Sequence, residues 1–119
     1  QIVLIAAILE KYLQIKFSSQ DIFFKISGGF KIKGSACDLG IALALLSSYF
    51  QKPLPEKILA LGEISLTGQI KPINFINLYA SESEKFGINT LLISSNQKIE
   101  TNAKTIRFTS VYELLSLFD

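Results

Sequence analysis

Serine hydroxyls and lysine amines are the side chains in this sequence that could form a nucleophile and its base. The sequence contains no histidine and a single cysteine, Cys37, which excludes serine–histidine and cysteine–histidine catalysis and removes the most common transition-metal ligand. A serine–lysine pair needs a lysine buried beside the hydroxyl, and Ser35, Ser47 and Ser48 are available hydroxyls. Because Ser47 and Ser48 fall near the end of a predicted helix, where such side chains usually pack or bond to the backbone, we expect no hydrolase activity.

One carboxylate, Asp38, opens the most apolar segment of the chain. A catalytic acid would usually share its work with a second carboxylate, and none lies nearby in the sequence. The alternative is that Asp38 is the N-cap or a first-turn acid of a helix, which contributes about 0.5–2 kcal/mol. We expect this second role.

Four lysines are the candidate nucleic-acid contacts. Lys25, Lys31 and Lys33 lie on neighbouring segments predicted to be extended, and Lys71 lies on another predicted strand. Together they could form a basic stripe that binds phosphates without reading base sequence. The alternative is a solvated face that covers a sheet edge. The net charge of +2 does not decide between the two, and Gly28-Gly29 lacks the lysine of a phosphate-binding loop.

The elements that must position these groups alternate between helices and strands. Apolar periodicity and turn residues predict helices over 2–13, 39–50, 76–86 and 111–118, and extended segments over 22–26, 30–33, 58–64, 69–73, 90–93 and 105–108. This order predicts an α/β sandwich of mixed sheet and helices, folded as one domain over residues 1–119. Ser110 and Glu113 are spaced as a capping box for the last helix.

Glycines and an acid mark the predicted hairpin between 58 and 73. Gly62 and Gly68 are expected to adopt backbone conformations that other residues resist. Glu63 either contacts a neighbouring subunit or fixes the turn through backbone N–H groups, and we favour the second role. Cys37 is expected to be a packed residue rather than a reactive thiol.

Two segments carry a resemblance to a known family. Residues 38–48 read DLGIALALLSS, and residues 62–72 follow the pattern Gly-Glu-Ile-x-Leu-x-Gly-x-Ile-x-Pro. Together they resemble the core helix and hairpin of the Lon proteolytic domain. The resemblance implies a Lon-like fold, which belongs with the ribosomal protein S5 domain 2-like folds.

The resemblance also implies that protease activity is lost. Asp38 occupies the position of the Lon serine nucleophile, and Tyr79 occupies the position of the catalytic lysine. The surroundings of Asp38, the Gly-Gly strand at 27–30 and residues 4–10 resemble the C-terminal Lon-like domain of the RadA (Sms) family of bacterial DNA-repair ATPases. Cys37 and Gly40 depart from that branch, in which alanine is more usual.

The resemblance implies a role in DNA repair and recombination, in which this domain would be a non-proteolytic scaffold that stabilises the ring and could offer a DNA-facing surface. It implies a cytoplasmic parent protein that forms hexameric rings on DNA, with further copies of itself, DNA and the recombination machinery as partners. ATP, magnesium and zinc would belong to the RecA-like ATPase and zinc-finger domains of that parent, so we expect no cofactor, metal site or enzymatic activity in this fragment. No apolar run approaches the ~20 residues of a membrane helix, and we expect no membrane partner.

The start of the sequence suggests a fragment, because Gln1 leads directly into an apolar helical pattern without a methionine or an N-cap residue. We expect the first strands of the Lon-like domain and the upstream domains to be missing. Two alternatives remain open. One is a Lon-like peptidase with a relocated serine–lysine pair, and the other is a Lon-like module of another AAA+ protein, such as ComM or a magnesium-chelatase relative.

Overall fold

The computed structural model describes residues 2–17 and 34–119. The segments predicted as extended over 22–26 and 30–33, with the turn between them, lie outside the described residues. The elements in chain order are α1 (Ile2–Leu13), η1 (Gly34–Cys37), α2 (Asp38–Phe50), β1 (Ile58–Leu61), β2 (Glu63–Ile64), β3 (Ile70–Lys71), α3 (Ile76–Glu84), β4 (Thr90–Ser94), β5 (Lys104–Phe108) and η2 (Val111–Phe118).

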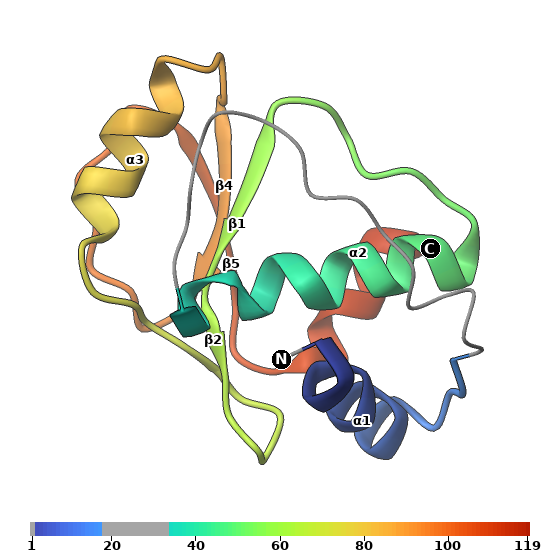
Figure 1. Cartoon of the computed structure of the whole chain (residues 1–119). Coiled ribbons are helices and arrows are strands. Elements are labelled where there is room, and N and C mark those ends of the chain that lie inside the picture. The colour runs from blue at the N-terminus through green and yellow to red at the C-terminus, as the bar shows by residue number, and fades with distance from the viewer. Residues whose placement is uncertain (1, 18–33) are drawn as a thin grey trace.

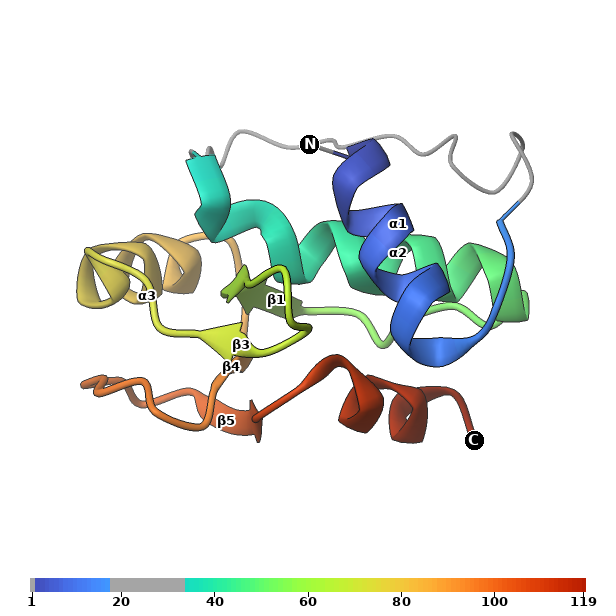
Figure 2. The ribbon, with the colours of Figure 1, turned by 90° about the horizontal axis from the view of Figure 1, so that it is seen from below.

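A parallel sheet with the strand order β1-β4-β5 forms the centre of the molecule. Helix α3 covers one face of this sheet, and α1, α2 and η2 lie on the other face (Figures 1 and 2). Strands β2 and β3 form a separate antiparallel pair. The α/β class predicted from the sequence is therefore confirmed. The mixed sheet is not found among the described strands, because the three-stranded sheet is entirely parallel and the antiparallel pair stands apart from it.

Strand β4 divides the core into two clusters. Leu91 and Ile93 pack with Ile76 and Ala80 on the α3 side, whereas Leu92 points to the larger cluster formed with α1, α2 and η2. Successive side chains of a strand point to opposite faces, so a continuous apolar strand requires cover on both sides. This is the arrangement expected for a parallel sheet.

The four predicted helices are all present, with one change of type. Helix α2 buries side chains around most of its circumference and ends at Gln51, which adopts a left-handed conformation before Pro53. The last helix, η2, is a 3-10 helix over all eight of its residues. Glu113 accepts hydrogen bonds from the backbone N–H groups of Thr109 at 2.7 Å and Ser110 at 3.1 Å, so its half of the predicted capping box is formed. None of the described helices is long and apolar enough to cross a membrane.

The single strand predicted over 58–64 is wrong, because the chain leaves the sheet at Gly62. The Gly62 N–H donates to the Ala36 carbonyl at 3.2 Å, and the Gly62 carbonyl accepts from the Leu39 N–H at 3.0 Å. A Cβ at Gly62 would lie 3.2 Å from Leu39 Cδ2 and 3.3 Å from Ile70 Cγ2. Close packing, and not a positive φ, is therefore what requires glycine here. Gly68 does adopt the predicted special conformation, with a φ of 81°.

Candidate functional site

Asp38 connects the start of α2 to the β2–β3 hairpin. Its side chain is only 2% exposed, and its Oδ2 accepts a hydrogen bond of 3.1 Å from the Ile64 backbone N–H. The adjacent Leu39 N–H donates to the Gly62 carbonyl, so backbone and side-chain bonds join the same two segments. A buried carboxylate is tolerated when it is hydrogen-bonded in this way.

The sequence located Asp38 correctly but missed its partner. Asp38 is a first-turn acid of α2, as predicted, whereas the N-cap residue is Cys37. The Ile64 N–H in the turn region is bound by Asp38, the role that the sequence analysis had assigned to Glu63. The only signal for this in the sequence is an acid at the edge of an otherwise apolar segment, because a buried acid must find a donor somewhere in the fold.

The two positions that the sequence resemblance matches to the Lon catalytic pair lie in different layers of the molecule. Asp38 begins α2, on one side of the parallel sheet, and Tyr79 lies half-buried on α3, on the other side, where it packs against the smaller core cluster. Asp38 is held by the fold and is shielded from solvent. This arrangement gives the carboxylate a structural role.

Of the three serines considered as nucleophiles, Ser47 has a hydrogen bond to the backbone. Ser47 Oγ donates to the Lys52 carbonyl at 2.6 Å, which is the back-bonding role predicted for it. The Lys52 amine donates instead to the Phe118 carbonyl at 2.8 Å. Ser35 lies exposed in η1, and Ser48 is half-buried near the end of α2. The Lys52 amine is therefore not positioned to act as a base for the Ser47 hydroxyl.

The β2–β3 hairpin covers the carboxyl ends of the parallel strands. Ser94, the last residue of β4, donates its hydroxyl to the Ile70 carbonyl at 2.9 Å, and the Ile70 N–H donates to the Thr109 carbonyl just after β5 at 2.9 Å. Ile64 and Ile70 are both buried. Open α/β sheets usually bind ligands at the carboxyl ends of their strands, and here the hairpin fills that place. Sequence reasoning found the hairpin but not its position.

Of the four candidate DNA-binding lysines, the described residues include only Lys71. Its side chain is exposed on β3, directly opposite Glu63 on β2. The register of the hairpin thus places an acidic residue across from this lysine. Lys25, Lys31 and Lys33 lie outside the described residues, and the basic stripe stays a prediction.

Cys37 is half-buried against the larger core cluster, as predicted. Burial, and next the neighbouring charge of Asp38, raise the pKa of its thiol above the ordinary value. The thiolate is the reactive form, so both effects reduce reactivity at neutral pH. In the part of the chain that the structure describes, no three His, Cys, Asp or Glu side chains come together to hold a metal ion. The expectation that this fragment carries no cofactor stays a prediction.

The fold and the hydrogen bond from Ile64 to Asp38 define an α/β domain. Comparison with known proteins assigns this domain to a family. The sequence profile of the family described as subunit ChlI of Mg-chelatase matches residues 4–97, and the chain belongs to that family.

Individual relatives indicate the branch. The chain is 35% identical over 106 residues to the DNA repair protein RadA of Aquifex aeolicus, which aligns 89% of this chain with 24% of the relative. It is 31% identical over 112 residues to RadA of Helicobacter pylori, with 94% and 25% aligned, and 38% identical over 93 residues to RadA of Streptococcus pyogenes, with 78% and 20% aligned. The chain thus spans a quarter or less of the length of these relatives, and the predicted resemblance to RadA is confirmed.

Proposed function

We propose that this chain is a non-proteolytic interaction domain of a RadA-type DNA-repair protein. The observation that carries the proposal is that the Asp38 carboxylate is buried and accepts a hydrogen bond from the Ile64 N–H. The sequence resemblance matches this residue to the Lon nucleophile. The hairpin over the carboxyl ends of the sheet supports the same conclusion, because it occupies the usual ligand site of α/β domains. ATP hydrolysis, magnesium and zinc would belong to other domains of a cytoplasmic parent protein.

Assembly is the proposed role of one apolar surface, defined by Leu66, Tyr112 and Tyr12. Leu66 and Tyr112 are exposed. Tyr12 links them, because its hydroxyl donates to the Leu66 carbonyl at 3.2 Å and its ring meets Tyr112 edge-on at 6.2 Å. Exposed apolar groups of this kind often mark contacts with other proteins. The proposed partner is a neighbouring copy in the ring of the parent protein.

A peptidase assay tests the non-proteolytic part of the proposal. The full chain is incubated with casein and with fluorogenic peptides, and Asp38→Ser is assayed alongside. We expect no turnover from either protein, because the serine would be buried beside Ile64 and Tyr79 replaces the lysine. Turnover that a single serine substitution such as Ser47→Ala abolishes would contradict the proposal and favour the relocated-pair peptidase.

Sedimentation of the full-length parent tests the assembly surface. The double variant Leu66→Glu/Tyr112→Glu should dissociate the assembled form, because two charges would be buried without partners. Leu78→Glu is the matched control, since Leu78 is a comparably exposed leucine on α3. Unchanged assembly in the double variant, or equal loss in both proteins, would exclude this surface as the contact.

A salt series tests the DNA-contacting part of the role. Binding of the full chain to fluorescent single-stranded and duplex DNA is compared with that of Lys31→Glu/Lys33→Glu and Lys71→Glu. Each lost phosphate contact should lower the slope of log affinity against log salt by about one. Lys104→Glu, an exposed lysine on β5, is the control. If all variants bind like the unchanged chain, or if no protein binds at low salt, the lysines are a solvated face.

A further inference from the structure

Phe75 combines a strained backbone with an exposed aromatic ring. As the N-cap residue of α3 it has a φ of 63° and a ψ of 25°, the left-handed region that bulky residues avoid. Its side chain is 74% exposed, so burial in this chain does not compensate for the strain. Glycine or asparagine would adopt this turn with less strain.

The residues on both sides hold Phe75 in this conformation. The backbone N–H of Ile73 donates to Gln97 Oε1 at 2.8 Å, and Gln97 Nε2 donates back to the Ile73 carbonyl at 3.4 Å. Gln97 is itself buried, and Ile76 is buried in the smaller core cluster. An outlier that its surroundings fix so firmly is typical of binding sites.

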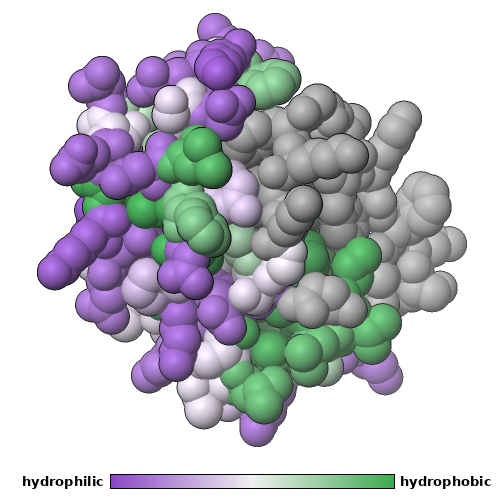
Figure 3. All heavy atoms as spheres, turned by 60° about the vertical axis from the view of Figure 1, so that its left-hand side comes forward, coloured by the Kyte–Doolittle hydropathy of each residue, from purple (hydrophilic) through white to green (hydrophobic). Residues whose placement is uncertain are grey.

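Leu78 extends the apolar surface along α3. It lies in the first turn of α3, three residues after Phe75, and it is 58% exposed. On the side of the molecule that α3 faces, a small group of apolar side chains is surrounded by hydrophilic ones (Figure 3). Phe75 and Leu78 together are called the α3 ridge below.

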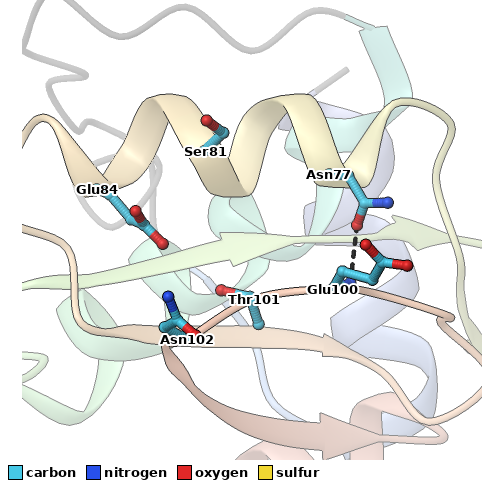
Figure 4. Close-up of a pocket in the computed structure, with 6 residues that line it drawn as sticks. All are labelled: Asn77, Ser81, Glu84, Glu100, Thr101 and Asn102. Carbon is cyan, nitrogen blue, oxygen red and sulfur yellow. Dashed lines mark hydrogen bonds between the residues drawn. The ribbon is translucent and has the colours of Figure 1, made fainter.

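A polar groove adjoins the α3 ridge. It has a volume of about 280 Å³, and its walls are a row of residues on α3 and a facing row on the connection that leads to β5 (Figure 4). The Asn77 side-chain oxygen accepts the Glu100 backbone N–H at 2.9 Å and ties the two walls together at one end. The lining residues are Asn77, Ser81, Glu84, Glu100, Thr101 and Asn102.

The chemistry of the groove selects its occupant. Glu84 and Glu100 place carboxylates toward opposite ends, and amides and hydroxyls lie between them. No basic side chain is among the lining residues. A phosphate backbone would be repelled by the two carboxylates, whereas a lysine or arginine side chain would be attracted and could donate hydrogen bonds to a carboxylate and to a neighbouring amide or hydroxyl oxygen.

We propose that the outer surface of α3 docks an extended polypeptide segment of a partner protein, which places an apolar side chain on the α3 ridge and a lysine or arginine in the groove between Glu84 and Glu100. A basic and apolar segment is the one class of partner that complements both halves of this surface. The inference deepens the proposed role as an interaction domain by naming the chemistry of a partner. It uses a different surface from the assembly contact at Leu66 and Tyr112.

Synthetic peptides test the proposal. The ¹⁵N-labelled full chain is titrated with a capped glycine–serine peptide that carries two leucines and two arginines, and with matched peptides in which glutamate replaces arginine or glycine replaces leucine. We expect saturable shifts of the amide signals of α3 and of residues 100–102, with the first peptide only. Phe75→Gly should weaken binding about 30-fold, as for a central aromatic contact, without lowering the midpoint of thermal unfolding, because glycine relieves the strain. If Phe75 had only a structural role, Phe75→Gly would not weaken peptide binding while leaving the midpoint of thermal unfolding unchanged.

Matched variants locate the contact. Glu84→Gln/Glu100→Gln should weaken binding by about 3–10-fold and reduce its dependence on salt, whereas Glu56→Gln should bind like the unchanged chain. The proposal is overturned if the glutamate peptide binds equally well or if the shifts map elsewhere. It is also overturned if a (dT)10 oligonucleotide, or a rise in protein concentration alone, shifts the same α3 signals without peptide. Because peptide hydrolysis is measured separately, failure here leaves the non-proteolytic role standing.

Discussion

Replacing Asp38 by alanine should destabilise the domain by removing the acceptor of the Ile64 N–H. A buried donor left without a partner costs about 1–3 kcal/mol, and loss of the first-turn negative charge of α2 costs about 0.3–1 kcal/mol more. We therefore expect Asp38→Ala to lower the free energy of unfolding by about 2–3 kcal/mol. Asp38→Asn keeps an oxygen at the same place, so we expect its cost to stay below about 1 kcal/mol.

Urea unfolding followed by far-ultraviolet circular dichroism measures both changes. With a denaturant slope of about 1.5 kcal/mol/M, a loss of about 2–3 kcal/mol moves the midpoint down by about 1.3–2 M. Glu84→Ala, an exposed acid in the last turn of α3, is the control and should move the midpoint by less than about 0.3 M. An Asp38→Ala midpoint within that margin would refute a structural role for the carboxylate. Equal losses in the alanine and asparagine variants would show that charge, and not the Ile64 bond, is responsible.

The same unfolding assay tests three glycine substitutions, and Cys37 is tested by this assay together with alkylation. Gly34 has a φ of 65°, and outside its chain neighbours no atom of the described residues lies within 4 Å of a Cβ added there. Gly34→Ala should therefore cost about 1 kcal/mol of strain alone. Gly68→Ala should cost more, because its Cβ would also lie 3.2 Å from Tyr12 Cδ2, and equal losses at both positions would contradict this. Gly62→Ala should cost about 1–3 kcal/mol through crowding without strain. The raised pKa of Cys37 stabilises the fold at low pH, and this contribution is lost as the pH rises above the ordinary thiol value of 9.0. Cys37→Ala should lack that alkaline loss, and iodoacetamide should alkylate Cys37 faster in urea than in the native chain; equal rates would argue against burial.

The sequence predicts the elements well where a local pattern decides them. The nearly all-apolar segment after Asp38 is a helix, and Thr67-Gly68 forms the turn of a hairpin, because helical length and turn chemistry are local properties. The break at Gly62 is not visible in the sequence, since it depends on backbone bonds to Ala36 and Leu39. Nor can the sequence distinguish an α-helix from a 3-10 helix over 111–118, because two turns are too short to separate a period of 3.0 from one of 3.6.

The site follows the same division. That Asp38 and Tyr79 stand at the positions of a lost catalytic pair stays a prediction, because it rests on the sequence resemblance alone. The partner of Asp38 lies 26 residues away, so its identity depends on how β2 is brought to α2. The exposed ring of Phe75 is also missed, because an aromatic residue before a predicted helix is read as core unless its φ is known.

The hairpin over the carboxyl ends of β4 and β5 has a consequence for small-molecule inhibitors. A compound designed for that edge of the sheet would have to break the Ser94–Ile70 and Ile70–Thr109 hydrogen bonds and expose the buried Ile70 side chain to water. Each of these steps opposes binding. A compound that binds this domain without disturbing the hairpin would therefore have to use another part of its surface.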